Sequence, residues 1–175
     1  MVNYYCYEIY KLVKRMDNDS QVNIKKEKPF WRVKKMQDMN EQEWESLCDN
    51  CGKCCCIRLE DDDTGEIYIT DVVCKLFDSE SCKCTSYINR SKKVPDCVTL
   101  TKDNIDKLHW MPKTCAYRLI SEGKELPHYH HLVSGSSSTI HDEGMSVKNA
   151  VISETLVPED EQIKRIVIWP GEPSV

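Results

Sequence analysis

The sequence predicts a small, cysteine-rich α+β domain with short helices, one hairpin and irregular loops. Three observations predict this class: eleven cysteines in 175 residues, a charged fraction of 30% with only two Phe, and signals for short elements along the chain. Such a composition gives a thin apolar core, so we expect something besides burial to hold the fold together. The cysteines are the residues that can do this.

Two helices and a hairpin are predicted from local signals. Asn40 followed by Glu43 has the pattern of a capping box and predicts a helix near residues 41–47. An Asp-rich turn followed by strand-forming residues predicts a hairpin over residues 57–70. An apolar pattern near residues 114–122, which ends in a glycine, predicts a second helix. Residues 159–169 predict a final amphipathic helix or strand.

Four thiols lie within eight residues at Cys48, Cys51, Cys54 and Cys55. A C-x-x-C loop directs two side chains at one centre, and the thiolate is the form that binds a metal. Read as a zinc site, the loop resembles a knuckle in which glycine supplies the turn. Read as an iron–sulfur site, it repeats the C-x2-C-x2-C run, but Arg58 occupies the position of the fourth cysteine. The motif therefore indicates zinc or iron without choosing between them.

The cellular compartment of the protein decides whether its cysteines form metal sites or a disulfide framework, because disulfides need an oxidising environment. Residues 1–28 contain no apolar run of the kind that forms a secretory signal, and no segment approaches the roughly 18 apolar residues of a membrane span. We therefore expect a cytoplasmic protein whose thiols serve metal or redox chemistry. A structural zinc contributes about 10–16 kcal/mol to the folding of small peptides, which is enough to organise such a domain.

Charge is distributed unevenly along the chain. Residues 1–38 contain nine Lys or Arg against five Asp or Glu, whereas residues 39–175 contain fifteen against twenty-four. The body is therefore acidic, and thiolates that bind a metal would make it more so, which disfavours nucleic acid as a partner. The basic arm either contacts an anionic partner or is simply solvated.

Further thiols follow the motif. Cys82 and Cys84 are separated by one residue, so an extended segment would place both side chains on the same side. A proline lies close before Cys97 and before Cys115, and it fixes the backbone near each thiol. Cys115 is also compatible with simple packing in its helix. A His-rich turn at residues 128–131 offers imidazole ligands, although four thiols already complete a zinc site.

Six blocks carry a likeness to a known family: PFW at residues 29–31, EWESLC at 43–48, CDNCGKCC at 48–55, DTGEIY at 63–68, PDC at 95–97 and TCAYRL at 114–119. Together they resemble the bacterial YcgN-like family, which contains the CxxCxxCC zinc- or iron-chelating domain of YkgJ type. The resemblance covers residues 29–175 and leaves residues 1–28 as an N-terminal extension. It implies nine metal-site cysteines: Cys48, Cys51, Cys54, Cys55, Cys74, Cys82, Cys84, Cys97 and Cys115. Cys6 and Cys56 look like additions in this chain.

The resemblance implies a metal site but no reaction, so three functions are considered. The first is a cytoplasmic metal-binding protein with one or two sites, in which Cys48, Cys51 and Cys54 form one group and Cys55 joins Cys82 and Cys84 in another. The second is a Cys-dependent or iron–sulfur enzyme, with Cys115 or Cys56 as a free nucleophile on a scaffold held by metal. The third is a zinc-stabilised adaptor whose basic arm recruits a protein partner. The sequence contains no phosphate-binding Gly-rich loop and no H-E-x-x-H motif.

Overall fold

The computed structural model describes residues 28–173, so nearly all of the predicted N-terminal extension, including Cys6, lies outside the described residues. The chain divides into two units, residues 1–33 and 34–175, which are described separately. The described part of the first unit contains the helix α2 (Phe30–Val33), where the rings of Phe30 and Trp31 meet edge to face at 5.2 Å. The boundary predicted after residue 28 stays a prediction.

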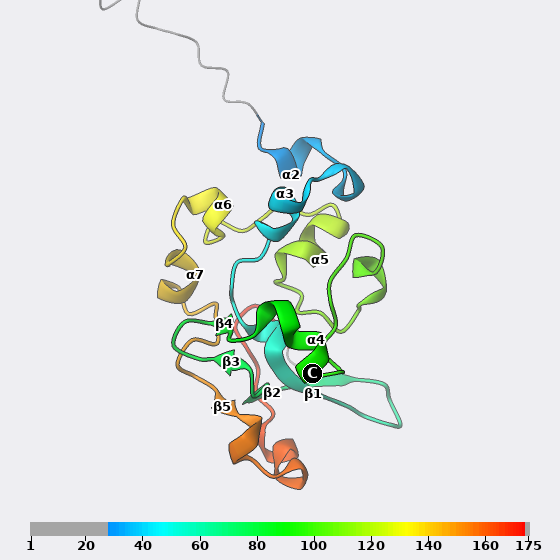
Figure 1. Cartoon of the computed structure of the whole chain (residues 1–175), viewed down its shortest axis with the longest axis vertical. Coiled ribbons are helices and arrows are strands. Elements are labelled where there is room, and N and C mark those ends of the chain that lie inside the picture. Colours follow the sequence, from blue (N-terminus) through cyan, green and yellow to red (C-terminus); the bar gives the residue numbers. More distant parts are fainter. Residues whose placement is uncertain (1–27, 174–175) are drawn as a thin grey trace, which may run out of the picture. The chain divides into compact units, whose positions relative to one another are not determined.

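The second unit mixes short helices with short strands, which confirms the predicted α+β class (Figure 1). Its α-helices are α3 (Glu41–Glu45), α4 (Arg90–Lys93), α5 (Ala116–Ser121), α6 (His131–Ser134) and α7 (Thr139–Asp142). Its 3-10 helices are η1 (Met36–Asp38), η2 (Lys53–Cys55), η3 (Tyr87–Asn89), η4 (Ile105–Lys107), η5 (Glu154–Leu156) and η6 (Glu159–Arg165). No helix within residues 28–173 combines the length and the apolarity needed to cross a membrane.

Helix α3 begins with the predicted capping box. The side chain of Asn40 accepts a hydrogen bond from the Glu43 amide at 2.8 Å, and the Glu43 carboxylate accepts one from the Asn40 amide at 2.9 Å. Two amide groups at the helix start are thereby satisfied. The helix buries Trp44 and ends at Glu45, so the cysteine motif begins in a loop directly after it.

The predicted hairpin is formed by β1 (Cys56–Glu60) and β2 (Ile67–Val73), which pair antiparallel. The carboxylate of Asp61 organises its turn by accepting hydrogen bonds from the amides of Asp63 and Thr64. Strand β5 (Ile152–Ser153) adds to β2 in parallel and completes a three-stranded sheet. A second sheet pairs β3 (Phe77–Asp78) with β4 (Lys83–Cys84) (Figure 1).

The C-terminal segment packs against β2. Where the sequence predicts an amphipathic helix or strand, the chain forms η6 and then an extended stretch with one antiparallel bridge from Ile166 to Thr70. The indole of Trp169 donates a hydrogen bond to the Thr70 carbonyl at 3.2 Å. Trp169 also closes an apolar core cluster, whose other members are Cys56, Val73, Cys82 and Val147. The C-terminal segment therefore helps to fix β2, the second strand after the cysteine motif.

Candidate metal centre

The cysteine motif is held as a tight loop between α3 and β1. Its backbone turns through left-handed conformations at Asn50, with φ of 58°, and at Gly52, with φ of 78°. The Asp49 carboxylate accepts a hydrogen bond from the Cys51 amide at 3.1 Å, and the Cys51 carbonyl accepts one from the Val147 amide at 2.8 Å. The loop is thus fixed from within and from a distant segment.

Gly52 occupies a position that a side chain would not fit. A Cβ atom built there would lie 2.5 Å from Cζ of Phe77 and 2.6 Å from Cγ2 of Val147. Both the positive φ and this close approach require glycine. The sequence interpretation of Gly52 as the turn residue of the motif is confirmed, and the packing adds a second reason for it.

A first group of thiols consists of Cys48, Cys51, Cys54 and Cys115. Burial raises the pKa of Cys48, Cys51 and Cys115, and repulsion from a thiolate at Cys54 raises all three further. This mutual repulsion means that the four sulfur atoms share one neighbourhood. Three come from the motif loop, and Cys115 comes from the N-terminal cap of α5.

A second group consists of Cys55, Cys74, Cys84 and Cys97. Burial raises the pKa of Cys74 and Cys97, and charge on Cys84 raises both further. A hydrogen bond with Cys54 raises the pKa of Cys55. Burial and charge on Cys74 raise this pKa further.

Backbone contacts hold this second group together. The Cys74 amide donates to the Cys55 carbonyl at 3.0 Å, and the small β3–β4 sheet brings Cys84 back opposite Phe77. The Cys97 amide donates to the Val94 carbonyl at 3.0 Å just after α4. Four separate stretches of chain thus deliver one thiol each.

The two groups adjoin at Cys54 and Cys55 and face one cavity of about 750 Å³. Its wall includes six of the nine predicted cysteines: Cys48, Cys54, Cys55, Cys74, Cys84 and Cys97. Aromatic side chains complete the wall, with the rings of Trp44 and Tyr117 in contact at 4.7 Å. Water reaches Cys48 and Cys54 from this cavity, although protein atoms surround both residues.

Cys82 lies elsewhere. Its side chain is buried in the apolar cluster with Val73, Val147 and Trp169, whereas Cys84 lines the cavity. The prediction that Cys82 and Cys84 converge is therefore wrong. The reason is that φ at Cys82 is 54°, so the chain bends there and the alternation of an extended strand does not apply. The thiols that accompany Cys55 and Cys84 are those of Cys74 and Cys97, in place of Cys82.

Arg58 binds backbone carbonyl groups of the motif loop. It occupies the position where an iron–sulfur motif would carry its fourth cysteine. Its guanidinium donates hydrogen bonds to the carbonyl oxygens of Lys53, Cys54, Cys56 and Trp110. The group also lies 4.7 Å from the centre of the Trp110 ring. Sequence reasoning noticed the substitution but not this role, in which one side chain ties four carbonyl groups around the thiols.

Lys53 is a second functional residue that sequence reasoning missed. It lies inside the motif and is completely buried. Its ammonium group donates to Oγ1 of Thr114 at 3.1 Å and to the Pro170 carbonyl at 2.5 Å, and it lies 3.5 Å from the Glu172 carboxylate. The motif loop, the residue before Cys115 and the C-terminal segment are thereby joined through one buried charge. A lysine between two cysteines of the motif is the only sequence signal for it.

Of the two histidines considered as ligands, His130 and His131, the first is occupied by structural contacts. His130 is fully buried, its Nδ1 accepts a hydrogen bond from the Leu132 amide at 3.1 Å, and its Nε2 donates to the Leu47 carbonyl at 3.1 Å. Burial lowers the pKa of His130, in keeping with a neutral ring. His131 stacks on it at 4.5 Å. His130 therefore fixes the chain at Leu47, just after α3, and neither of its ring nitrogens is available to a metal.

The donor chemistry of the two groups fits zinc or iron, since each offers four thiols and the adjoining carbonyl groups are already bound by Arg58. All ten cysteines among residues 28–173 are free, which fits metal binding better than a disulfide framework. In the same residues, no three His, Cys, Asp or Glu side chains already form a ready-made metal site. Metal binding therefore requires the thiols of a group to turn toward a common centre.

Of the cysteines within residues 28–173, Cys54 should be the first to react in the reduced, metal-free protein. A hydrogen bond from Cys55, followed by the charge of Arg58, lowers the pKa of Cys54 to about 7, whereas burial raises that of Cys82 to about 11. At pH 7 about half of Cys54 is thiolate against about one part in ten thousand of Cys82. We expect iodoacetamide labelling followed by mass spectrometry to show Cys54 modified first, with a rate that rises between pH 6 and 8. Labelling of Cys82 before Cys54 would contradict this assignment.

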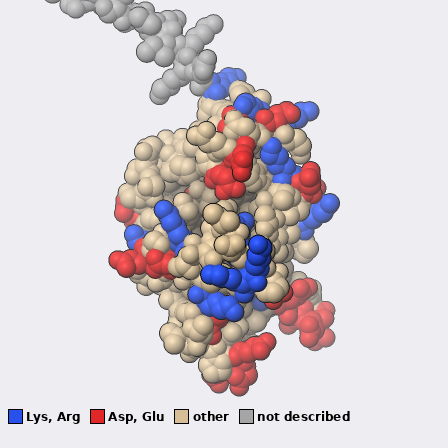
Figure 2. Space-filling model, in the orientation of Figure 1, with Lys and Arg blue, Asp and Glu red and all other residues tan. Residues whose placement is uncertain are grey.

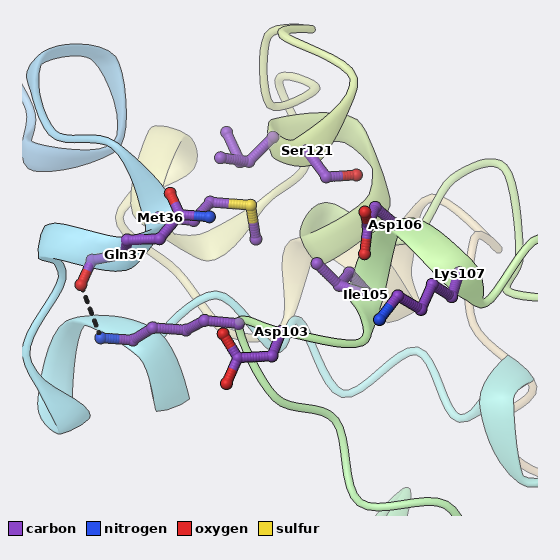
Figure 3. Close-up of a pocket in the computed structure, with 9 residues that line it drawn as sticks. Met36, Gln37, Asp103, Ile105, Asp106, Lys107 and Ser121 are labelled. Atoms are coloured by element: carbon purple, nitrogen blue, oxygen red, sulfur yellow. Dashed lines mark hydrogen bonds between the residues drawn. The ribbon is translucent and has the colours of Figure 1, made fainter.

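A second hollow of about 570 Å³ lies between η1, η4 and the end of α5 (Figure 3). It contains no thiol, and its lining mixes Met36, Ile105 and Ile120 with charged residues. One of the two lysines that line it, Lys102, donates from its ammonium group to the carbonyl oxygens of Gln37 and Met39 and so anchors the loop before α3. Because this charge is used by the backbone, we assign the hollow no ligand.

The fold and the thiol groups define a small cysteine-rich domain of mixed helices and strands. Residues 47–116 match the family model CxxCxxCC, described as "Putative zinc- or iron-chelating domain". That stretch contains both thiol groups, from Cys48 to Cys115.

The chain belongs to the UPF0260 family. It is 51% identical over 147 residues to a UPF0260 protein of Parvibaculum lavamentivorans, covering 84% of this chain and 96% of the relative. A UPF0260 protein of Marinobacter nauticus is 51% identical over 141 residues, with 81% and 95% covered. One from Mesorhizobium japonicum is 54% identical over 136 residues, with 77% and 92% covered. No solved structure matches the chain.

Proposed function

We propose that this protein binds zinc or iron through two four-cysteine groups, one made of Cys48, Cys51, Cys54 and Cys115, the other of Cys55, Cys74, Cys84 and Cys97. The observation that carries the proposal is the gathering of thiols from distant parts of the chain. Six of the eight line one cavity, and burial and charge on Cys54 raise the pKa of the other two, Cys51 and Cys115. Such a set is costly to assemble, because burial disfavours most of these thiolates until a cation is bound. A bound metal cation stabilises the buried thiolates and so offsets that cost.

The chemistry of the proposed sites depends on the metal. Four thiolates around zinc leave no open position, so zinc would be structural. Iron with sulfide would instead supply electron transfer, with the thiolates as terminal ligands. In either case Arg58 and Lys53 hold the loop that carries four of the eight thiols, and their positive charges oppose the negative charge of the thiolates.

The alternative of a Cys-dependent enzyme loses its predicted nucleophiles. Burial raises the pKa of both Cys56 and Cys115 to about 12, and a thiol in that state is a poor nucleophile at neutral pH. The adaptor function predicted for the basic arm rests on residues outside the described part of the chain. Cytoplasmic location, an iron–sulfur cluster and the likeness to the YcgN-like family also stay predictions.

Metal content of matched cysteine variants tests the proposal. The protein is purified without oxygen, and metal, acid-labile sulfide and visible absorption are measured on one sample. We expect Cys115→Ala and Cys84→Ala each to lose the metal of one group, since each removes one of four thiols.

Cys82→Ala is the matched control, because Cys82 is a family cysteine that lies in the apolar core. It should keep the full metal content of the unmodified protein. Loss of metal in Cys82→Ala together with full retention in Cys115→Ala would refute the grouping.

A further inference from the structure

One face of this acidic protein is positively charged. Between Ser81 and Pro95 the chain contains four basic residues and no acidic one: Lys83, Arg90, Lys92 and Lys93. Three of these four belong to α4. In the space-filling view, basic side chains gather over the place that α4 occupies (Figure 2). The charge is local, because residues 39–175 as a whole are strongly acidic.

The two lysines of this face are free to bind. Lys92 and Lys93 are exposed, and within the described residues neither side chain takes part in an ion pair or hydrogen bond. Arg90 differs, since it donates to the Tyr87 carbonyl at 2.7 Å and stacks 3.9 Å above the Tyr87 ring. Arg90 therefore shapes the face, while the lysines present their charge to solvent.

Exposed apolar side chains lie close to these charges in the sequence, on both sides of α4. Ile88 is 93% exposed, and Tyr87 and Val98 are about half exposed. Protein interfaces combine an apolar centre with a polar rim. We call the surface made of Tyr87, Ile88, Lys92, Lys93 and Val98 the α4 face.

The α4 face borders the cavity that contains the thiols. The residues on either side of the two lysines, among them Tyr87, Arg90, Val94 and Cys97, line that cavity. A molecule bound on the α4 face would therefore lie over an approach to the thiols from solvent. This position connects binding at the surface with access to the proposed metal groups.

We propose that the α4 face binds an acidic segment of a partner protein that also presents apolar side chains, and that this contact controls metal exchange at the thiols. The acidic segment complements Lys92 and Lys93, and its apolar residues cover Ile88 and Val98. Nucleic acid fits less well, because its affinity comes from many phosphate contacts and the rest of this body repels a long polyanion. The consequence for metal exchange rests on the proposed function, whereas the contact itself does not.

A labelled peptide of alternating glutamate and leucine serves as the probe. Fluorescence anisotropy with the zinc-loaded full chain should show binding that weakens as salt is added, since exposed charges are screened. The variant K92E/K93E should weaken this binding by about tenfold or more. The matched variant K35E/K107E changes the net charge equally at two exposed lysines outside α4 and should leave binding intact. Saturating peptide should also slow zinc transfer to a chelator, and this slowing should be lost in K92E/K93E.

Three results would overturn the inference: binding that K92E/K93E leaves unchanged, equal weakening by both double variants, or equally tight binding of a single-stranded oligonucleotide. Zinc content is measured on every sample beforehand. A chain that takes up no zinc refutes the proposed function, while the anisotropy titration still decides whether the α4 face binds an acidic segment.

Discussion

Replacing Gly52 by alanine is expected to lower the free energy of unfolding by about 3 kcal/mol or more and to reduce metal binding. Two physical effects add. A non-glycine residue held at φ of 78° costs about 1–3 kcal/mol, and a methyl group forced into a filled space costs about as much again. The added Cβ would meet Phe77 and Val147, which belong to two segments far apart in the sequence. The loop must then shift, and with it Cys51 and Cys54.

Gly65 provides the matched control. Its φ of 69° is nearly the same, but no atom lies within 4 Å of the position that a Cβ would take. Gly65→Ala should therefore show only the conformational cost, about 1 kcal/mol, with metal content unchanged. Urea unfolding of both variants, with and without metal, measures the difference. Equal destabilisation by the two substitutions would mean that the packing around Gly52 is not what fixes the motif.

Replacing Lys53 by methionine is expected to destabilise the protein by about 3 kcal/mol, because removal of one partner leaves a buried charge uncompensated. The charge left behind is the carboxylate of Glu172. This carboxylate also accepts hydrogen bonds from the Lys113 amide at 2.7 Å and from the Thr114 hydroxyl at 2.7 Å. Loss of the ammonium group should loosen the C-terminal segment. Hydrogen exchange at the indole N–H of Trp169 should therefore become faster in the variant.

A double-mutant cycle with Glu172→Gln isolates the interaction. The double variant Lys53→Met with Glu172→Gln should be more stable than the sum of the two single changes predicts, since the orphaned carboxylate is then neutral. Lys107→Met, at an exposed lysine, should change stability by less than about 0.5 kcal/mol. Strict additivity in the cycle would show that Lys53 and Glu172 do not act together.

Local features could be predicted from the sequence because their causes lie within a few residues. The capping box at Asn40 and Glu43, the Asp61 turn of the hairpin and the glycine cap after α5 are each specified by neighbours in the chain. The role of Gly52 was also accessible, since a tight metal loop requires such a residue. These elements account for the α+β class.

The grouping of the thiols could not be predicted, because it depends on contacts between distant segments. Cys115 reaches the motif only through the packing of α5, and Cys82 leaves it because the backbone takes a positive φ. Two basic residues were missed for a similar reason. Nothing in a pattern of cysteines shows that Lys53 is buried beside Glu172, or that Arg58 binds the carbonyl groups of the motif loop.

The central claim is that thiols alone hold the metal. X-ray absorption at the metal edge of the anaerobically purified protein counts its ligands directly. We predict about four sulfur neighbours at roughly 2.3 Å for zinc, or a sulfur shell with a nearby second iron for a cluster. Nitrogen or oxygen atoms in the first shell, or thiols oxidised in pairs with no metal bound, would contradict the account.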